Sequence, residues 1–154
     1  MKNIYFTEVQ VKSILLLQEK GVAIILLEGP GEKWNLPILA KPSEVFSISL
    51  ALEGQEPPRP QAHDLIASII QRLNAKVLHV LIDILDEPLC HGIIALDIGG
   101  RELDFDSRPS DAISLALRVH APIFVSPDVV AKGAVHLNHE EGSLDLGERT
   151  KLRN

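Results

Sequence analysis

The chain has 154 residues, a formal net charge of −6 and 45% apolar residues. A chain of this length and composition is typical of one globular domain and argues against a disordered or fibrous protein. The longest apolar run, Val22 to Leu27, is far shorter than the ~20 residues that a membrane helix needs, and the N-terminus has no signal-peptide pattern. We therefore expect a cytoplasmic protein without a membrane partner, which agrees with the presence of a single cysteine, Cys90.

The net negative charge also bears on whether the protein binds nucleic acid. Binding to phosphates normally draws on a basic surface. Aromatic residues make up only 4% of the chain, so few rings are present on which bases could stack. A nucleic-acid role would therefore need a local basic patch or bound metal cations.

Alternating and apolar segments predict three strands in each half of the chain. In the first half they cover residues 9–17, 22–27 and 36–40, and in the second half 77–84, 91–98 and 101–107. The last two are joined by Gly99-Gly100, which predicts a β-hairpin. A further short strand is expected over 122–126.

Between the two halves, residues 62–74 show the clearest helical pattern. Apolar residues recur at helical spacing, which predicts one stripe of an amphipathic helix. The stripe consists of Ala62, Leu65, Ile66, Ile69, Ile70 and Leu73.

The two halves also share a helix start. KPSEVFSISL at 41–50 matches RPSDAISLAL at 108–117, and residues 36–50 align with 103–117 without a gap. We predict an internal duplication and an α+β fold. The fold is a single compact domain of two β-β-β-α repeats, with helix 62–74 between them and the helices packed against mixed or antiparallel sheets. The domain is expected over 1–126, followed by a polar C-terminal extension over 127–154.

Two interpretations of the shared helix start are open. Proline, serine and a first-turn acid all stabilise a helix N-terminus, so the motif has a structural explanation. In the second copy, however, Asp111, Ser114 and Arg118 form one polar stripe, and Arg108 lies beside the free N–H groups. This arrangement could bind a phosphate. His63 and Asp64, in the first turn of helix 62–74, likewise could supply a general base or could only suit the helix start.

The strand before the second Pro-Ser helix is acidic. Glu102, Asp104 and Asp106 alternate with Leu103 and Phe105, so the three acids share one face of the strand. Carboxylates two residues apart lie ~7 Å from one another and could share a site for Mg²⁺ or Mn²⁺. The alternative is the solvated face of an antiparallel strand.

Three stretches together resemble the bifunctional nuclease (DNase–RNase) domain family. They are L36-P-I with Glu44, the run E53-G-Q-E-P-P-R-P-Q-A-H-D-L65, and D106-S-R-P-S-D-A-I-S-L-A-L-R-V-H-A-P-I-F-V125. The resemblance covers residues 5–126 and implies a self-associating α/β domain that degrades DNA and RNA. The positions matching the recurrent polar residues of the family are Glu44, His63, Asp64, Asp106, Arg108, Ser110 and Asp111, and Asp104 matches a commonly acidic position. Where relatives often carry a tyrosine, this chain has Cys90-His91.

The leading hypothesis is a nuclease of low sequence specificity that is assisted by Mg²⁺ or Mn²⁺, with DNA or RNA as substrate. The metal would be held by Asp104, Asp106 and Asp111, and the phosphate by Arg108, Ser110 and Arg118. The catalytic candidates are His63, Asp64, Asp106 and Asp111, with Glu44 as a secondary candidate. The alternative is a non-catalytic binding or regulatory module. In either case we expect a homodimer or a higher homo-oligomer.

Overall fold

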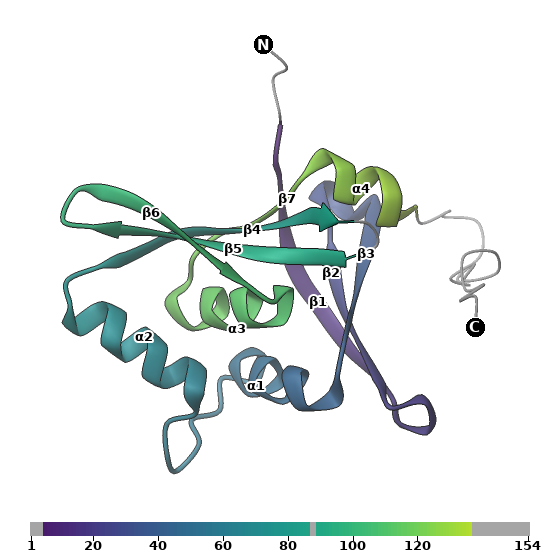
Figure 1. Cartoon of the computed structure of the whole chain (residues 1–154). Helices are drawn as coiled ribbons and strands as arrows, with labels where there is room; N and C mark the ends of the chain where they lie inside the picture. Colours follow the sequence, from purple (N-terminus) through teal and green to yellow (C-terminus); the bar gives the residue numbers. More distant parts are fainter. Residues whose placement is uncertain (1–4, 87–88, 137–154) are drawn as a thin grey trace.

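A mixed sheet of eight strands forms the frame of the molecule (Figure 1). The computed structural model describes residues 5–86 and 89–136. The strands follow the order β6-β5-β4-β7-β1-β2-β3-β8 across the sheet. They are β1 (Thr7–Leu17), β2 (Val22–Glu28), β3 (Trp34–Ala40), β4 (Lys76–Asp86), β5 (Leu89–Ile98), β6 (Arg101–Ser107), β7 (Ile123–Val125) and β8 (Val135–His136).

Four α-helices in the described residues complete the α+β domain, which confirms the predicted fold class. They are α1 (Pro42–Leu52), α2 (Ala62–Arg72), α3 (Pro109–Val119) and α4 (Pro127–Gly133), and the short 3₁₀ turns η1 (Gln18–Lys20) and η2 (Pro30–Glu32) follow β1 and β2. The order of three strands and a helix occurs twice, as β1–β3 with α1 and as β4–β6 with α3, and α2 lies between them. The duplication itself stays a prediction.

β7 joins the two groups of strands. It pairs antiparallel with β1 and parallel with β4, and both Ile123 and Val125 are buried. An apolar strand with neighbours on both edges belongs in the middle of a sheet, because all of its backbone groups can be paired there. The two halves are thereby held in one sheet with one core.

Helices α1, α2 and α3 lie on the same side of β4–β6 (Figure 1). α3 is the central one and packs against α1, α2, β4 and β5. It approaches β5 closely at Gly92, where a Cβ atom would stand 2.8 Å from Ala112 Cβ and 2.9 Å from the Arg108 carbonyl oxygen. The glycine is thus what lets the first turn of α3 rest on the sheet.

The predicted amphipathic helix is present as α2, but its apolar stripe is not buried. Ala67 and Ile70 pack against the core, and no residue of α2 is fully buried. The large stripe residues are 43–70% exposed: Leu65, Ile66, Ile69 and Leu73. Packing of α2 on its neighbours therefore uses only one edge of the stripe.

The domain also extends beyond residue 126, where the sequence suggested a polar extension. Ser126 caps α4 by accepting a hydrogen bond from Val129 N–H at 3.3 Å, and Val129 is only 2% exposed. β8 then pairs with β3. The sequence did not predict these elements because apolar residues are few there: within α4 only Val129 is fully buried, with Val130 packed against the core beside it. The rest of the predicted extension, 137–154, lies outside the described residues.

Among the helices of the described residues, none combines the length and the apolar character needed to cross a membrane.

Candidate functional site

The first turns of α1, α2 and α3 meet in one polar network. In α1, the Glu44 carboxylate accepts a hydrogen bond from Lys41 N–H at 2.6 Å, and in α2 the Asp64 carboxylate accepts one from Gln61 N–H at 2.9 Å. Both acids therefore cap the helix that carries them, as the structural interpretation expects. Asp111 of α3 differs, because its carboxylate accepts hydrogen bonds from the side chains of Arg108 and His63.

Arg108 and His63 hold the Asp111 carboxylate. Arg108 Nε donates to Asp111 Oδ2 at 2.7 Å and Arg108 Nη2 to Oδ1 at 2.9 Å, a bidentate pair. The hydrogen bond from the Arg108 guanidinium has the largest effect on Asp111 and lowers its pKa. Burial raises this pKa and a hydrogen bond from His63 lowers it, so the net direction is downward. Asp111 is thus an ionised carboxylate that accepts hydrogen bonds and donates none.

His63 links this carboxylate to two buried serines. His63 Nε2 lies 2.9 Å from Asp111 Oδ1, and His63 Nδ1 lies 2.9 Å from Ser47 Oγ, which in turn lies 2.8 Å from Ser114 Oγ. Arg118 Nη1 donates to Ser114 Oγ at 2.7 Å.

Asp111 can only accept, so His63 Nε2 donates to Asp111 Oδ1, and Arg118 can only donate, so Ser114 Oγ accepts from it. The hydroxyls of Ser47 and Ser114 can each donate and accept, so the bond between Ser47 Oγ and His63 Nδ1 can run in either direction. The order resembles a Ser-His-acid triad. Ser47 is buried, however, so a substrate does not reach its hydroxyl.

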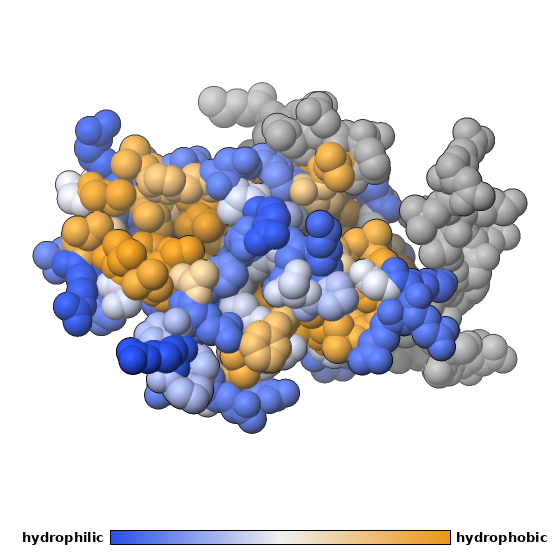
Figure 2. Space-filling view, turned by 60° about the horizontal axis from the view of Figure 1, so that its bottom comes forward, coloured by the Kyte–Doolittle hydropathy of each residue, from blue (hydrophilic) through white to orange (hydrophobic). Residues whose placement is uncertain are grey.

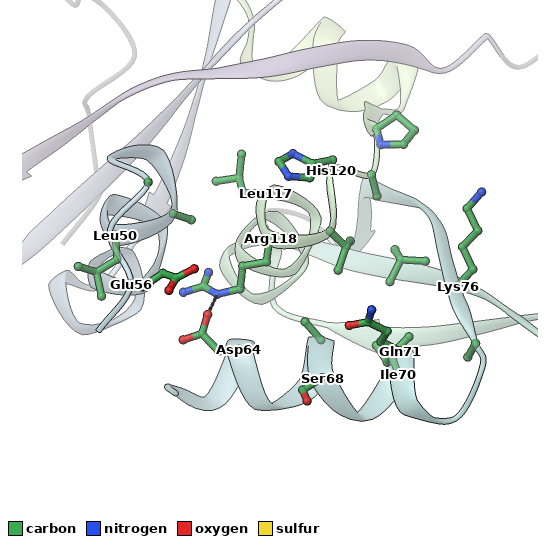
Figure 3. Close-up of a pocket in the computed structure, with 18 of the residues that line it drawn as sticks. Leu50, Glu56, Asp64, Ser68, Ile70, Gln71, Lys76, Leu117, Arg118 and His120 are labelled. Atoms are coloured by element: carbon green, nitrogen blue, oxygen red, sulfur yellow. Dashed lines mark hydrogen bonds and ion pairs between the residues drawn. The ribbon is translucent and has the colours of Figure 1, made fainter. Parts of the chain in front are cut away.

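Arg118 is the structural centre of the helix layer. Its side chain is only 9% exposed, and Nε donates to Asp64 Oδ1 at 2.6 Å (Figure 3). Nη2 donates to the Ser47 carbonyl oxygen at 3.1 Å, so the guanidinium joins α1, α2 and α3. Burial raises the pKa of Asp64, but the Gln61 N–H and Arg118 outweigh it, and the net direction is downward.

A cleft of about 890 Å³ opens beside Arg118, between the C-terminal ends of α1 and α3 and the flank of α2 (Figure 3). In Figure 3 the guanidinium points to Asp64 and contacts it, His120 lies close by at the end of α3, and Lys76 lies on the opposite side of the view. Every nitrogen of the Arg118 guanidinium has an acceptor within the protein. Four of its five N–H groups donate within the protein and the side chain is only 9% exposed, so Arg118 holds the helices together. Its contact with a phosphate stays a prediction.

Arg108 is placed differently. Besides Asp111 it contacts Glu44 through Nη1 and Oε1 at 2.9 Å, and Ser110 donates to the same Glu44 oxygen at 3.1 Å. The Arg108 side chain is nevertheless 61% exposed. Its hydrogen bonds to Asp111, despite some burial, raise the pKa of Arg108, so the guanidinium is a fixed and accessible positive charge.

Arg108 also lines a smaller pocket at the edge of the sheet, which we call the sheet-edge pocket. It measures about 360 Å³ and is formed by Leu89, Cys90, His91, Asp106, Ser107, Arg108 and Pro109. His91 Nδ1 lies 2.9 Å from Asp106 Oδ1. Burial, followed by the charge of Asp83, raises the pKa of Cys90, so the thiol is neutral there and is not an activated nucleophile.

The three carboxylates predicted as metal ligands lie on two sides of the sheet. Ser107 pairs with Gly92 and faces α3, so the preceding Asp106 points to the opposite face, together with Asp104. Asp111, in contrast, belongs to the helix layer. Within residues 5–86 and 89–136, no group of three His, Cys, Asp or Glu side chains is placed to hold a metal ion. The predicted ligand set therefore does not fit one ion in this structure.

His91 is the site residue that the sequence analysis did not select. The Gly99-Gly100 turn sets the register of the hairpin and pairs Ile93 with Asp106. His91 is then the diagonal neighbour of Asp106 on the same face. Counting back from the turn would have shown this pair.

A bifunctional nuclease domain model matches residues 24–138, three quarters of the chain including α4 and β8. The chain belongs to the bifunctional nuclease domain family. Among its relatives, an uncharacterised protein of Mycobacterium tuberculosis (strain H37Rv) is 36% identical over 134 residues, which are 86% of this chain and 79% of that protein.

Plant members of the bifunctional nuclease domain family are more distant. Bifunctional nuclease 2 of Oryza sativa subsp. japonica is 28% identical over 106 residues, 67% of this chain and 33% of that protein. Bifunctional nuclease of Oryza minuta is 28% identical over 107 residues, 68% of this chain and 32% of that protein. The match covers about one third of each plant protein.

Proposed function

We propose that this chain is a nuclease that hydrolyses phosphodiester bonds of DNA and RNA, with its chemistry in the sheet-edge pocket. The observation that carries the proposal is that a His–Asp pair and an exposed arginine line the same pocket. The family and the names of its plant members supply the substrate class.

His91 acts as the general base. An ionised carboxylate can only accept, so Asp106 fixes the imidazole proton on Nδ1 and leaves the lone pair on Nε2. A water molecule gives its proton to Nε2 while its oxygen attacks phosphorus. The bond from phosphorus to the ester oxygen breaks, and the leaving alkoxide takes a proton from solvent.

Arg108 binds the phosphate and stabilises the charge that builds up on its oxygens. Its guanidinium is fixed on one side by Asp111 and Glu44 and is exposed on the other. The buried network of His63, Ser47 and Ser114 acts through Asp111, because it holds the carboxylate that orients Arg108. His63 and Asp111 are thus positioning residues.

No step of this mechanism passes through a metal ion, since Asp104 and Asp106 do not converge with Asp111. The involvement of Mg²⁺ or Mn²⁺ is a separate proposal that rests on the acidic strand β6. It is tested by the same assays with Mg²⁺, with Mn²⁺ and with EDTA.

The direct experiment is cleavage of labelled DNA and RNA by highly purified protein and its variants. We expect His91→Ala to lower kcat/KM by about 100-fold or more, the usual contribution of a general base. Arg108→Ala is expected to lower it by a similar factor, because it removes the phosphate contact.

His79→Ala is the matched control. His79 lies on β4, in the same sheet as His91 on β5. Its ring packs edge-on against Phe124, with ring centroids 5.9 Å apart, and no carboxylate orients it. Its removal should leave the rate unchanged. Equal activity of wild type, His91→Ala and Arg108→Ala would show that the cleavage comes from a contaminating enzyme and would refute the proposal.

A binding module without turnover is the second candidate. It is favoured by the closed network around Asp111, in which each charge of the first helical turns has a partner within the protein. In that case the purified chain binds a dinucleotide through Arg108 but does not cleave it. Binding by the wild type, lost in Arg108→Ala, without any cleavage would favour this candidate.

A further inference from the structure

The edge strand β6 carries opposite charges on its two faces. Ser107 pairs with Gly92 and faces α3, so every second residue before Ser107 also lies on the helix side of the sheet. These residues are one basic and two apolar side chains: Arg101, Leu103 and Phe105. The opposite face carries three acids: Glu102, Asp104 and Asp106. The helix-side face of β6, residues 101, 103, 105 and 107, therefore holds a positive charge and no negative one.

The helix-side face of β6 is open to solvent. Phe105 is 45% exposed and Leu103 39% exposed, and Arg101 is exposed as well. In Figure 2 the end of the molecule that carries α2 and the hairpin of β5 and β6 shows a broad orange area at the left. Exposed apolar areas of this kind mark interaction sites or ligand-binding grooves, and the mechanism proposed above uses none of these three side chains.

This face leads directly to the sheet-edge pocket. Ser107, at the end of the face, and Arg108, which follows it, both line that pocket. Two residues along a strand span ~7 Å, so Phe105 lies about that far from Ser107. Arg101 lies ~20 Å from Ser107, at the other end of β6. A guanidinium therefore stands at each end of an apolar face, and one of the two is the proposed phosphate ligand.

We infer that the helix-side face of β6 binds a single-stranded segment of the nucleic acid whose phosphodiester bond lies in the sheet-edge pocket. This inference rests on the proposed function, which places a phosphate at Arg108. A base beside that phosphate stacks on Phe105, a neighbouring base packs on Leu103, and a more distant phosphate contacts Arg101. Because every base has a π-face, stacking on Phe105 accepts all bases and requires no particular sequence.

The chemistry of this face selects unpaired bases. In a duplex each base is covered by its neighbours in the stack, so a side chain can stack on it only after it has left the duplex. Phe105 and Leu103 have no group that reads the edge of a paired base through a hydrogen bond. Binding of a duplex would therefore rest on phosphate contacts alone, and a chain with a net charge of −6 is poorly suited to that.

Charge also decides which face of β6 the nucleic acid follows. Phosphates on the opposite face would lie beside Glu102, Asp104 and Asp106 and would be repelled. β6 is the last strand of the sheet, so a strand of nucleic acid can leave the pocket over this edge and turn to the helix side. An apolar segment of a protein could also cover Phe105, but it would have no use for the charge of Arg101.

Fluorescence anisotropy tests the preference for single strands. We measure it in the His91→Ala background, so that binding is observed without cleavage, with labelled oligothymidylate and with its duplex with oligoadenylate. The single strand should bind at least about 10-fold more tightly, and Phe105→Ala should weaken its binding by about 10-fold through the loss of one stacked base. Phe105→Trp should restore the affinity. Phe46→Ala is the control, since Phe46 is 57% exposed on α1 outside this face, and circular dichroism verifies that each variant is folded.

The salt dependence of the same binding tests Arg101. Each phosphate contact on a single strand contributes about 0.7 to the slope of log affinity against log salt concentration, so Arg101→Ala should lower the slope by that amount. Arg59→Ala is the control, since Arg59 is exposed in the connector between α1 and α2 and its variant should keep the slope.

The outcomes separate this inference from the proposed function. Equal affinity for single strand and duplex, or binding that survives both Phe105→Ala and Arg101→Ala, would overturn the inference even if the wild type cleaves nucleic acid. Single-strand binding that depends on Phe105 and Arg101, in a wild type that never cleaves, would support this face and refute the nuclease. Absence of binding to either oligonucleotide would overturn the inference in favour of a protein partner.

Discussion

At the scale of single residues, the same helix position serves two purposes in this molecule. Glu44 and Asp64 accept hydrogen bonds from the backbone of their own helices, whereas Asp111 accepts from Arg108 and His63. The first two acids thus stabilise a helix start, and the third fixes a side chain. Sequence similarity between the two Pro-Ser motifs hides this difference because the residue types are nearly the same.

Asp111→Asn should make this difference measurable as a pH dependence. The pKa of Asp111 is lowered in the folded state, so the carboxylate stabilises the fold above its unfolded pKa of ~3.9 and loses that contribution as pH falls through the folded pKa. Urea unfolding at pH 7 should show a loss of about 1.5–3 kcal/mol, the usual range for hydrogen bonds to a charged group. The loss should shrink as pH falls below the unfolded pKa of ~3.9.

Asp104→Asn is the control for that measurement, since Asp104 is exposed on β6. It should change the free energy of unfolding little at either pH. A deficit of Asp111→Asn that is the same at pH 7 and at pH 3 would disprove the ionic role of Asp111.

The buried serine of α1 gives a second test. Ser47→Ala removes the hydroxyl between His63 and Ser114 and leaves buried polar groups without a partner, which costs about 1–3 kcal/mol. Ser49→Ala in the same helix removes only a bond to the Val45 carbonyl oxygen, already part of the helix ladder, and should be close to neutral. Thermal unfolding of both variants compares them, and equal midpoints would contradict the network described above.

At the scale of elements, the site depends on how closely α3 approaches β5. Ser107 Oγ donates to the Gly92 carbonyl oxygen at 3.2 Å, and the first turn of α3 rests on Gly92 itself. This contact brings Arg108 to the edge pocket that holds His91 and Asp106. Strand β5, through one glycine, therefore positions two of the three proposed site residues relative to each other.

Gly92→Ala should disturb stability and activity together. The added Cβ would stand 2.9 Å from the Arg108 carbonyl oxygen, so the backbone has to shift, at a cost of about 1–3 kcal/mol. Because Arg108 moves with that backbone, cleavage should also fall. Chemical unfolding and cleavage rates measured on the same sample check this, and an unchanged rate with lowered stability would separate Gly92 from the site.

Much of this arrangement could be predicted from the sequence, and the exceptions have physical causes. Alternation and the Gly99-Gly100 turn predicted β4–β6, and helical spacing predicted α2. Spacing alone does not say which side of a helix meets the core, so the exposure of Leu65 and Ile69 was not foreseen. Alternation places Asp106 on one face of β6 but does not say that α3 covers the other face. The separation of Asp106 from Asp111 could therefore be learned only from the folded structure.

At the scale of the whole molecule, the buried polar groups and the exposed charged groups have different roles. Arg118 and the serines tie three helices together inside the helix layer, while Arg108, Asp106 and His91 present their groups at the edge of the sheet. The proposed phosphate chemistry therefore uses side chains other than the buried ones that tie the helices together, and Asp111 links the two sets by holding Arg108.

The central claim is that His91 and Asp106 act as one unit in phosphodiester cleavage. The most direct test is a double-mutant cycle of kcat/KM for wild type, His91→Ala, Asp106→Asn and the double variant, on DNA and on RNA. If Asp106 acts only by orienting His91, the double variant loses no more activity than His91→Ala alone. Independent losses that multiply in the double variant, or full activity of His91→Ala, would contradict the account.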